Sequence, residues 1–280
     1  MRFSTRVLAS ALLLLLAAAC GRGLPDGGEP AVAKPPEAGA AQTLQEADCR
    51  LTMGWDPWPP FHYTGFGGEL TGFDVELLRA MAADAGCELE FARESWAVLL
   101  GQVRDGRIDL LTGATMTEAR ETFAYFSQPV REEQFALFIR TGEAHFWQGS
   151  GLRELMDRGL RLGVTDAYVY SEPVQAVIDD PVYTARVTLS RFGEANIGLL
   201  LDGAIDAFAD DSFAAATMIR RLGFEGAISK HRLSLGEGTK VRIMYSKATV
   251  PPELVARLDA SLARLKESGE YASLQHRYLD

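Results

Sequence analysis

A short polar motif that follows an apolar run holds the residues best suited to bind an anion. In "LLTGATMTEAR" (110–120), Gly113, Thr115, Thr117 and Arg120 are spaced as Gly-x-Thr-x-Thr-x-x-Arg. Glycine lets a ligand approach the backbone, and threonine offers a hydroxyl and an N–H. Arginine carries a planar fork of N–H groups that fits a carboxylate with two parallel hydrogen bonds. The motif indicates a carboxylate site, although a lone arginine is more often a solvated helix residue with an ordinary ion pair.

Two further groups of residues could complete such a site. The segment "AIDAFADDS" (204–212) ends on two adjacent acids, Asp210 and Asp211, which could supply a charge opposite to that of Arg120 or, instead, cap a helix. Aromatic side chains gather after the first strand and at the start of a later helix: Trp55, Trp58, Phe61, Tyr63 and Trp96. Aromatic faces provide contact area and hold cations. Their alternative role is core packing, which suits Tyr63.

Apolar periodicity predicts the elements that position these residues. Strands are predicted at 49–56, 87–93, 107–114, 133–140, 160–166, 185–192 and 239–247, with another inside 194–212. Helices are predicted at 72–86, 95–106, 117–124, 151–159, 172–180 and 212–223, and one or two helices cover 251–279. Because strand and helix alternate, the fold class is α/β with largely parallel sheets, where ligands bind at the carboxyl ends of the strands.

A weak internal similarity predicts two related lobes. Residues 101–115 and 199–212 both read as helix, turn, Ile-Asp, apolar strand and polar end. The chain crosses between the lobes twice, near 139–143 and near 236–241, and two crossings favour a hinge motion. We therefore expect lobe 1 to comprise 48–139 plus 241–280, and lobe 2 to comprise 140–240.

The first 47 residues indicate export and tethering. Arg2 and Arg6 precede an apolar run and three alanines before Cys20, which is typical of a secretory signal peptide over residues 1–20. Cys20 in this position resembles the lipidated cysteine of a bacterial lipoprotein signal, and plain secretory cleavage is the alternative. Residues 21–47 are rich in Gly, Pro and Ala and predict a flexible linker.

Composition narrows the possible partners and the redox state. The net charge is −10 with no Lys/Arg-rich run, which argues against nucleic acid. The four histidines are scattered, so we expect no metal and no cofactor. In an exported protein Cys49 and Cys87 are expected to form a disulfide if their strands are parallel neighbours. Two buried thiols are the alternative.

Three segments resemble family 3 of the bacterial extracellular solute-binding proteins, which bind polar amino acids for ABC transporters. They are "GFDVELLRAMA", "LLGQVRDGRIDLLTGATMTEAR" and "FAYFSQPV", within a resemblance over roughly residues 48–280. The resemblance implies a type II periplasmic-binding-protein-like fold, with two α/β lobes, a two-strand hinge and a ligand cleft between them. It implies a monomeric periplasmic receptor that delivers a small carboxylate-bearing ligand, most often an amino acid, to an inner-membrane permease.

The resemblance also implies roles for single residues. Arg120 would clamp the ligand carboxylate, and Gly113 and Thr115 would also contact the ligand. Trp58 and Trp96 would cover the ligand, and Asp211, with Asp210 as the adjacent alternative, would take its amino group. The sequence departs from the family in "TDAYVY" (165–170), where Thr165, Tyr168 and Val169 replace a Gly-Thr pair, and at Trp55, where a polar residue is common. A more aromatic pocket, including Phe61 and Tyr168, would suit an aromatic or cationic amino acid or another small organic acid.

Two other functions fit the same scaffold. A cyclohexadienyl-dehydratase-like enzyme would need a placed acid or base, and only Glu172 and Glu194 offer one in the second lobe, outside any motif. A ligand sensor for a separate signalling partner is the other alternative. We expect a binding protein without enzymatic activity, lipid-anchored in the periplasm to the inner or the outer membrane.

Overall fold

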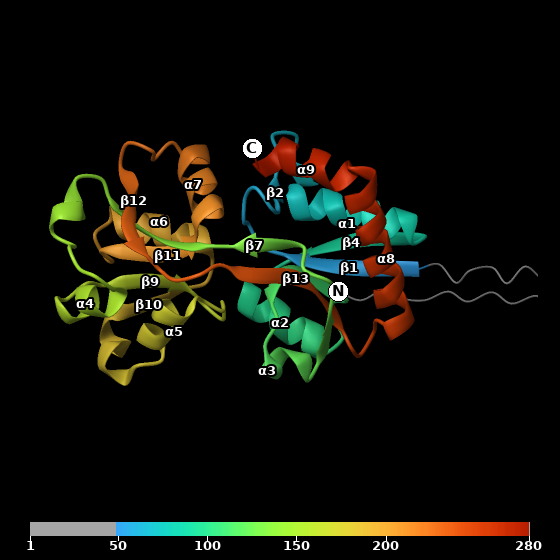
Figure 1. The fold of residues 1–280 in the computed structure, drawn as a ribbon, viewed down its shortest axis with the longest axis horizontal. Coiled ribbons are helices and arrows are strands. Elements are labelled where there is room, and N and C mark those ends of the chain that lie inside the picture. The colour runs from blue at the N-terminus through green and yellow to red at the C-terminus, as the bar shows by residue number, and fades with distance from the viewer. Residues whose placement is uncertain (1–48, 280) are drawn as a thin grey trace, which may run out of the picture. The chain divides into compact units, whose positions relative to one another are not determined.

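The computed structural model describes residues 49–279, and the predicted signal peptide, Cys20 and linker lie outside these residues. Two mixed sheets form the framework of this part of the chain, and each has helices on both faces (Figure 1). Within 49–279, no helix is long and apolar enough to cross a membrane. The predicted α/β class is confirmed by this arrangement.

The first sheet has the strand order β4-β1-β5-β13-β6, and β7 also pairs with β13. Its strands are β1 (Cys49–Trp55), β4 (Cys87–Arg93), β5 (Leu110–Thr115), β6 (Ala124–Phe126), β7 (Arg131–Glu133) and β13 (Thr239–Ser246). The strands β4, β1 and β5 run parallel because helices connect them, whereas β13 pairs antiparallel with β5, β6 and β7.

Helices α1 (Phe73–Asp84), α8 (Pro252–Ser268) and α9 (Glu270–Leu279) pack together on one face of the first sheet. Helix α2 (Trp96–Arg104) packs on the other face (Figure 1). A two-stranded hairpin, β2 (Tyr63–Thr64) with β3 (Leu70–Thr71), precedes α1. The C-terminal segment forms two helices because Gly269 adopts a left-handed conformation, φ 85°, that ends α8.

The helix predicted at 117–124 is shorter than expected. Helix α3 covers only Glu118–Glu121, and Ala124 already belongs to β6, where it pairs with Ser246 of β13. The ladder with β13 thus overrides the local helical pattern.

The second sheet has the order β10-β9-β11-β8-β12. Its strands are β8 (Phe135–Arg140), β9 (Leu162–Thr165), β10 (Val187–Ser190), β11 (Ala207–Asp211) and β12 (Ile228–Ser234). Helices α4 (Leu152–Asp157) and α5 (Glu172–Ile178) share one apolar core with it, and α6 (Gly193–Leu201) and α7 (Ser212–Arg221) share another. Two 3-10 helices, Glu143–His145 and Pro181–Arg186, complete this half.

The first crossing between the sheets lies earlier than predicted. All of β8 pairs within the second sheet, so the chain leaves the first sheet at Gln134 and not near residue 139. The apolar run of β8 is buried between β11 and β12, and this pairing assigns β8 to the second sheet. The second crossing joins β12 to β13 over residues 235–238. Sheet membership supports a lobe 1 of 49–133 plus 239–279 and a lobe 2 of 135–234.

The two Ile-Asp segments play the same structural part in their sheets. The Asp109 carboxylate accepts the backbone N–H of Thr52 at 2.7 Å, and the Asp206 carboxylate accepts that of Arg161 at 3.0 Å. Each aspartate thereby fixes a strand to its parallel neighbour, which gives the weak sequence similarity a shared physical cause.

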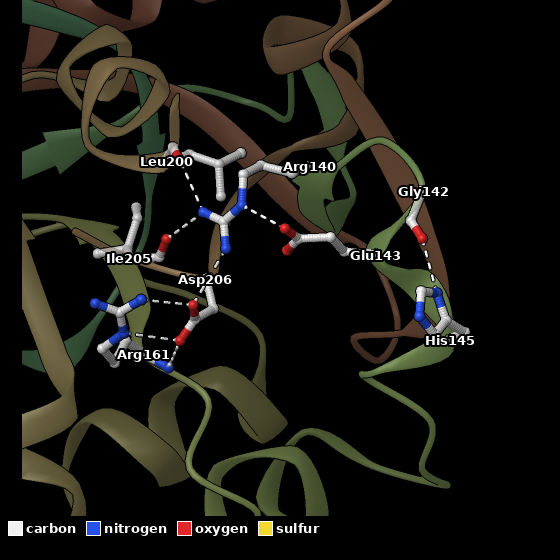
Figure 2. Close-up of polar contacts among 8 residues, drawn as sticks. All are labelled: Arg140, Gly142, Glu143, His145, Arg161, Leu200, Ile205 and Asp206. Atoms are coloured by element: carbon white, nitrogen blue, oxygen red, sulfur yellow. Dashed lines mark hydrogen bonds and ion pairs between the residues drawn. The ribbon is translucent and has the colours of Figure 1, made fainter. Parts of the chain in front are cut away.

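An ionic cluster around Asp206 anchors the end of α6 (Figure 2). Arg140 donates to the carbonyls of Leu200 and Ile205, both at 2.7 Å, and to Asp206 at 3.2 Å and Glu143 at 2.9 Å. Burial would raise the pKa of Asp206, but the hydrogen bonds from Arg161 and Arg140 outweigh it and hold the pKa below its ordinary value. The cluster thus links β8 to the end of α6 and to the start of β11.

The predicted disulfide is present. Strands β1 and β4 are parallel neighbours in which Cys49 lies opposite Cys87, and their sulfurs are bonded at 2.02 Å. The bond links the first residues of two neighbouring strands of the first sheet.

Candidate ligand-binding site

A small cavity lies where residues of the two lobes meet. Its lining residues are Asp56, Trp58, His62, Trp96, Thr112, Gly113, Thr115, Arg120, Glu133, Tyr168 and Val169. Six predicted site residues are thus brought together: Trp58, Trp96, Gly113, Thr115, Arg120 and Tyr168. The cavity volume is ≈ 20 Å³, enough for one water but far below the roughly 300 Å³ of a small-molecule pocket.

Arg120 lines this cavity and is held in place by hydrogen bonds. Thr117 caps α3 by accepting the backbone N–H of Arg120 at 3.2 Å, which aims the side chain back along β5. Its guanidinium donates to the carbonyl of Thr115 at 2.9 Å and, across the cleft, to that of Ala167 at 3.0 Å. The side chain is buried, and burial lowers the pKa of Arg120 to about 10 against the attraction of Glu133. Arg120 is not a solvated helix residue.

The carbonyl of Ala167 receives two donors from the opposite lobe. The indole N–H of Trp96 donates to it at 3.1 Å, alongside the bond from Arg120. Ala167 has φ 60°, the only positive φ of a non-glycine residue within 49–279. One oxygen atom of lobe 2 thus occupies the position at which a carboxylate oxygen could take the same two hydrogen bonds.

Tyr168 lines the same cavity as Arg120. Its ring meets Trp58 edge-on at 6.4 Å between centroids and Trp96 edge-on at 5.9 Å. Burial raises the pKa of the Tyr168 hydroxyl well above its usual range, so the ring stays neutral. The glycine-free loop therefore contributes an aromatic side chain to the cavity.

Two features require a glycine at position 113: its positive φ angle and the close approach of Trp58. Its φ is 69°, and a Cβ at this position would come within 2.7 Å of Cζ3 of Trp58. The glycine thus lets the indole ring of Trp58 approach β5 closely.

Three predicted site residues do not line the cavity. Trp55 packs in the lobe 1 core with Arg93 over its ring at 5.3 Å, because it faces the opposite side of the strand from the cleft. Phe61 lies beneath Arg131, whose guanidinium carbon is 3.4 Å from the ring centroid. Asp211 lies at the start of α7. A ligand contact from any of the three stays a prediction.

The two adjacent aspartates of β11 are engaged with the backbone. Asp211 accepts the N–H groups of Phe213 (3.0 Å) and Ala214 (2.7 Å) through Oδ1 and that of Gln134 (3.2 Å) through Oδ2. Asp210 accepts the N–H of Asp211 at 2.7 Å, and the indole N–H of Trp58 also faces its carboxylate. Burial, followed by the neighbouring Asp211, raises the pKa of Asp210 to about 7.

Sequence reasoning missed four cavity residues, Asp56, His62, Thr112 and Glu133. Burial raises the pKa of Asp56, while His62, whose Nδ1 is 3.9 Å from Oδ1 of Asp56, opposes this. The sequence did contain a signal for Asp56, because this residue immediately follows the last residue of β1. Polar residues that follow an apolar strand were the criterion that selected the motif of Arg120. No local signal marked Glu133, because its position depends on where the chain crosses between the sheets.

The fold and the site define a two-lobed binding protein. The profile of the bacterial extracellular solute-binding proteins, family 3, matches residues 51–280, so the chain belongs to this family. The structure is similar to that of an ancestral arginine-binding protein bound to arginine, with a TM-score of 0.70, 23% identity and coverage of 82% of this chain and 98% of that one. The predicted type II periplasmic-binding-protein fold is confirmed.

Two relatives show how the similarity is distributed. The probable histidine-binding protein of Neisseria gonorrhoeae is 24% identical over 224 residues, which cover 78% of each chain. The cyclohexadienyl dehydratase of Pseudomonas aeruginosa is 31% identical over only 91 residues, 32% of this chain and 34% of that enzyme. The similarity to a binding protein therefore extends over most of the chain, and that to the enzyme over a third of it.

Proposed function

We propose that this solute-binding protein is the receptor of an ABC-type uptake system and that its ligand is an amino acid held through its carboxylate. The observation that carries the proposal is Arg120, a buried guanidinium with no carboxylate of residues 49–279 within ion-pair distance and its N–H groups directed at the cleft. An uncompensated buried charge is costly, and a bound carboxylate would remove that cost. Relatives that bind histidine and arginine support the choice of an amino acid.

On binding, a carboxylate oxygen of the ligand would replace the carbonyl oxygen of Ala167 as a hydrogen-bond acceptor. The ligand carboxylate takes the place of the Ala167 carbonyl on Arg120 and Trp96, and the loop 166–170 moves to make room. Because the chain crosses between the lobes twice, this displacement is coupled to hinge motion. The permease would then recognise the lobes closed around the ligand.

A thermal-shift panel tests this function. The full-length protein is mixed with each of the twenty amino acids, with cystine and with small organic acids. A ligand at one hundred times its Kd adds about 2.7 kcal/mol to the free energy of unfolding, a readily measured shift. Absence of a shift with every amino acid would overturn the proposal.

We propose binding without chemical conversion. Glu172 and Glu194, the acids considered for an enzyme, do not line the cavity. The short match to the dehydratase and the buried acid Glu133 favour an enzyme as the second candidate. Mass spectrometry of the bound ligand after prolonged incubation decides between them, because a receptor returns the ligand unchanged.

Replacement of Tyr168 by alanine is expected to tighten ligand binding by about tenfold. The ligand no longer has to displace a ring with two aromatic contacts, each of which is worth about 0.5–1.5 kcal/mol. Isothermal titration with the amino acid found in the panel measures the change. Tyr183→Ala, which removes a buried tyrosine elsewhere in lobe 2, is the control for general destabilisation. Weaker binding by Tyr168→Ala would show that the ring covers the ligand instead.

We also propose a periplasmic location with a lipid anchor on Cys20, supported by the signal-like residues 1–20 and by the family. The mature protein is expected to remain with membranes when Cys20 is present and to become soluble in the Cys20→Ser variant. Fractionation of cells followed by immunoblotting measures this. Equal membrane association of both forms would contradict lipidation.

A further inference from the structure

Glu133 is an acid at the crossing between the two lobes. It is the last residue of β7, it pairs with Thr239 of β13, and the chain passes into lobe 2 at the next residue. Its side chain is only 4% exposed and lines the same cavity as Arg120. A cationic side chain from α3 and an acidic side chain from the end of β7 thus face one small space.

The other acids near this space already have partners. Asp56 also lines the cavity, and its Oδ1 lies 3.9 Å from Nδ1 of His62. Asp211 accepts three backbone N–H groups, and Asp210 accepts one and does not line the cavity. No hydrogen bond from residues 49–279 reaches the carboxyl oxygens of Glu133. Of the two acids that line the cavity, Glu133 is therefore the one without an ion-pair or hydrogen-bond partner among residues 49–279.

The charges around Glu133 favour its neutral form. Burial raises its pKa well above the ordinary value, and Asp211 and Asp210 raise it further. Arg131 and Arg120 oppose this increase without cancelling it. The titratable groups that face Glu133 are Arg131 on β7, Arg120 on α3, Asp210 and Asp211 on β11, and Tyr168 and Tyr170 in the loop before α5.

We propose that Glu133, rather than Asp211, binds the ammonium group of the amino-acid ligand, an inference that rests on the proposed function. Arg120 then neutralises one end of the zwitterion and Glu133 the other. An ammonium group stabilises the ionised carboxylate, so Glu133 releases its proton to solvent as the ligand binds. Because the pKa of Glu133 is raised, affinity increases as pH rises toward that pKa and decreases as pH falls.

Isothermal titration with matched ligands tests this role. The probes are the amino acid that gives the largest shift in the thermal panel and its deaminated counterpart, which keeps the carboxylate and the side chain. Wild-type full-length protein is expected to bind the deaminated probe about 10- to 100-fold more weakly, because that probe cannot form the charge-assisted hydrogen bond to Glu133. Titrations at neutral pH in buffers of different ionisation enthalpy are expected to show release of up to one proton.

The isosteric variant Glu133→Gln separates this role from a structural one. It is expected to discriminate between the two probes only severalfold and to release no proton. Glu132→Gln, which changes the exposed acid next to it on β7, is the matched control and is expected to behave as wild type. Asp211→Asn keeps an acceptor oxygen for the α7 cap and tests the competing assignment.

The outcomes distinguish this inference from the proposed function. Undiminished discrimination and proton release in Glu133→Gln, with loss of discrimination in Asp211→Asn, would overturn it while leaving the amino-acid receptor intact. If no amino acid binds the wild-type protein, both proposals fail. Loss of discrimination and of proton release in Glu133→Gln alone supports the assignment.

Discussion

Replacement of Arg120 by alanine is expected to weaken amino-acid binding by about 30-fold to several thousandfold, or 2–5 kcal/mol. The variant leaves the ligand carboxylate in a buried cavity without the fork that would pair with it. It also removes the bonds to the carbonyls of Thr115 and Ala167, so part of the contact between the lobes is lost. Isothermal titration with the ligand from the thermal panel measures the change in Kd.

Two further variants sharpen the Arg120 experiment. Arg120→Lys keeps the charge but cannot form two parallel hydrogen bonds, and we expect it to recover only part of the affinity. Arg107→Ala removes an exposed guanidinium that pairs with Asp105 outside the cavity, and its affinity is expected to be unchanged. Thermal melts without ligand show whether each variant is folded. Wild-type affinity in a folded Arg120→Ala protein would place the carboxylate site elsewhere.

Loss of the disulfide is expected to lower the free energy of unfolding by about 4 kcal/mol, from the entropy of the chain loop that the bond closes. The sequence separation of 38 between Cys49 and Cys87 sets this value. For a protein of this size the melting temperature should fall by about 10 °C. The double variant Cys49→Ser, Cys87→Ser is compared with wild type by thermal and urea unfolding.

The same disulfide experiment has an internal control. A reductant should destabilise the wild type to the level of the double variant and leave the double variant unchanged. Ligand affinity should be preserved, because the bond lies at the start of β1 and the cavity at its end, about 20 Å along a seven-residue strand. A melting temperature of the wild type that is insensitive to reductant would contradict a stabilising bond.

Local patterns were sufficient where chemistry and position come from one segment. The motif 113–120 places Gly113, Thr115 and Arg120 together because a strand end, a cap and one helical turn determine their spacing. Likewise, the opposition of Cys49 and Cys87 follows once two parallel strands begin at those residues. These predictions needed only local propensity and the geometry of adjacent elements.

Edges and crossings were harder to predict. No strand is predicted over Ile228–Ser234, where β12 forms. This strand carries polar residues at several positions and lies at the edge of its sheet, so one of its sides has no strand partner. The first crossing was placed too late because the apolar run of β8 fits either sheet by composition. Only pairing with β11 and β12 assigns it to the second lobe.

The sequence by itself determined the family, the α/β class, the disulfide and the position of Arg120, since each depends on residues near one another in the chain or on simple periodicity. Only the tertiary structure decided which acid faces Arg120, that Asp211 is engaged in capping α7, and that Ala167 and Tyr168 occupy the cleft. These features arise where segments distant in sequence meet, and burial there sets the charge and the hydrogen-bond partners of each side chain. Such an environment is a property of the packed lobes and not of any single segment.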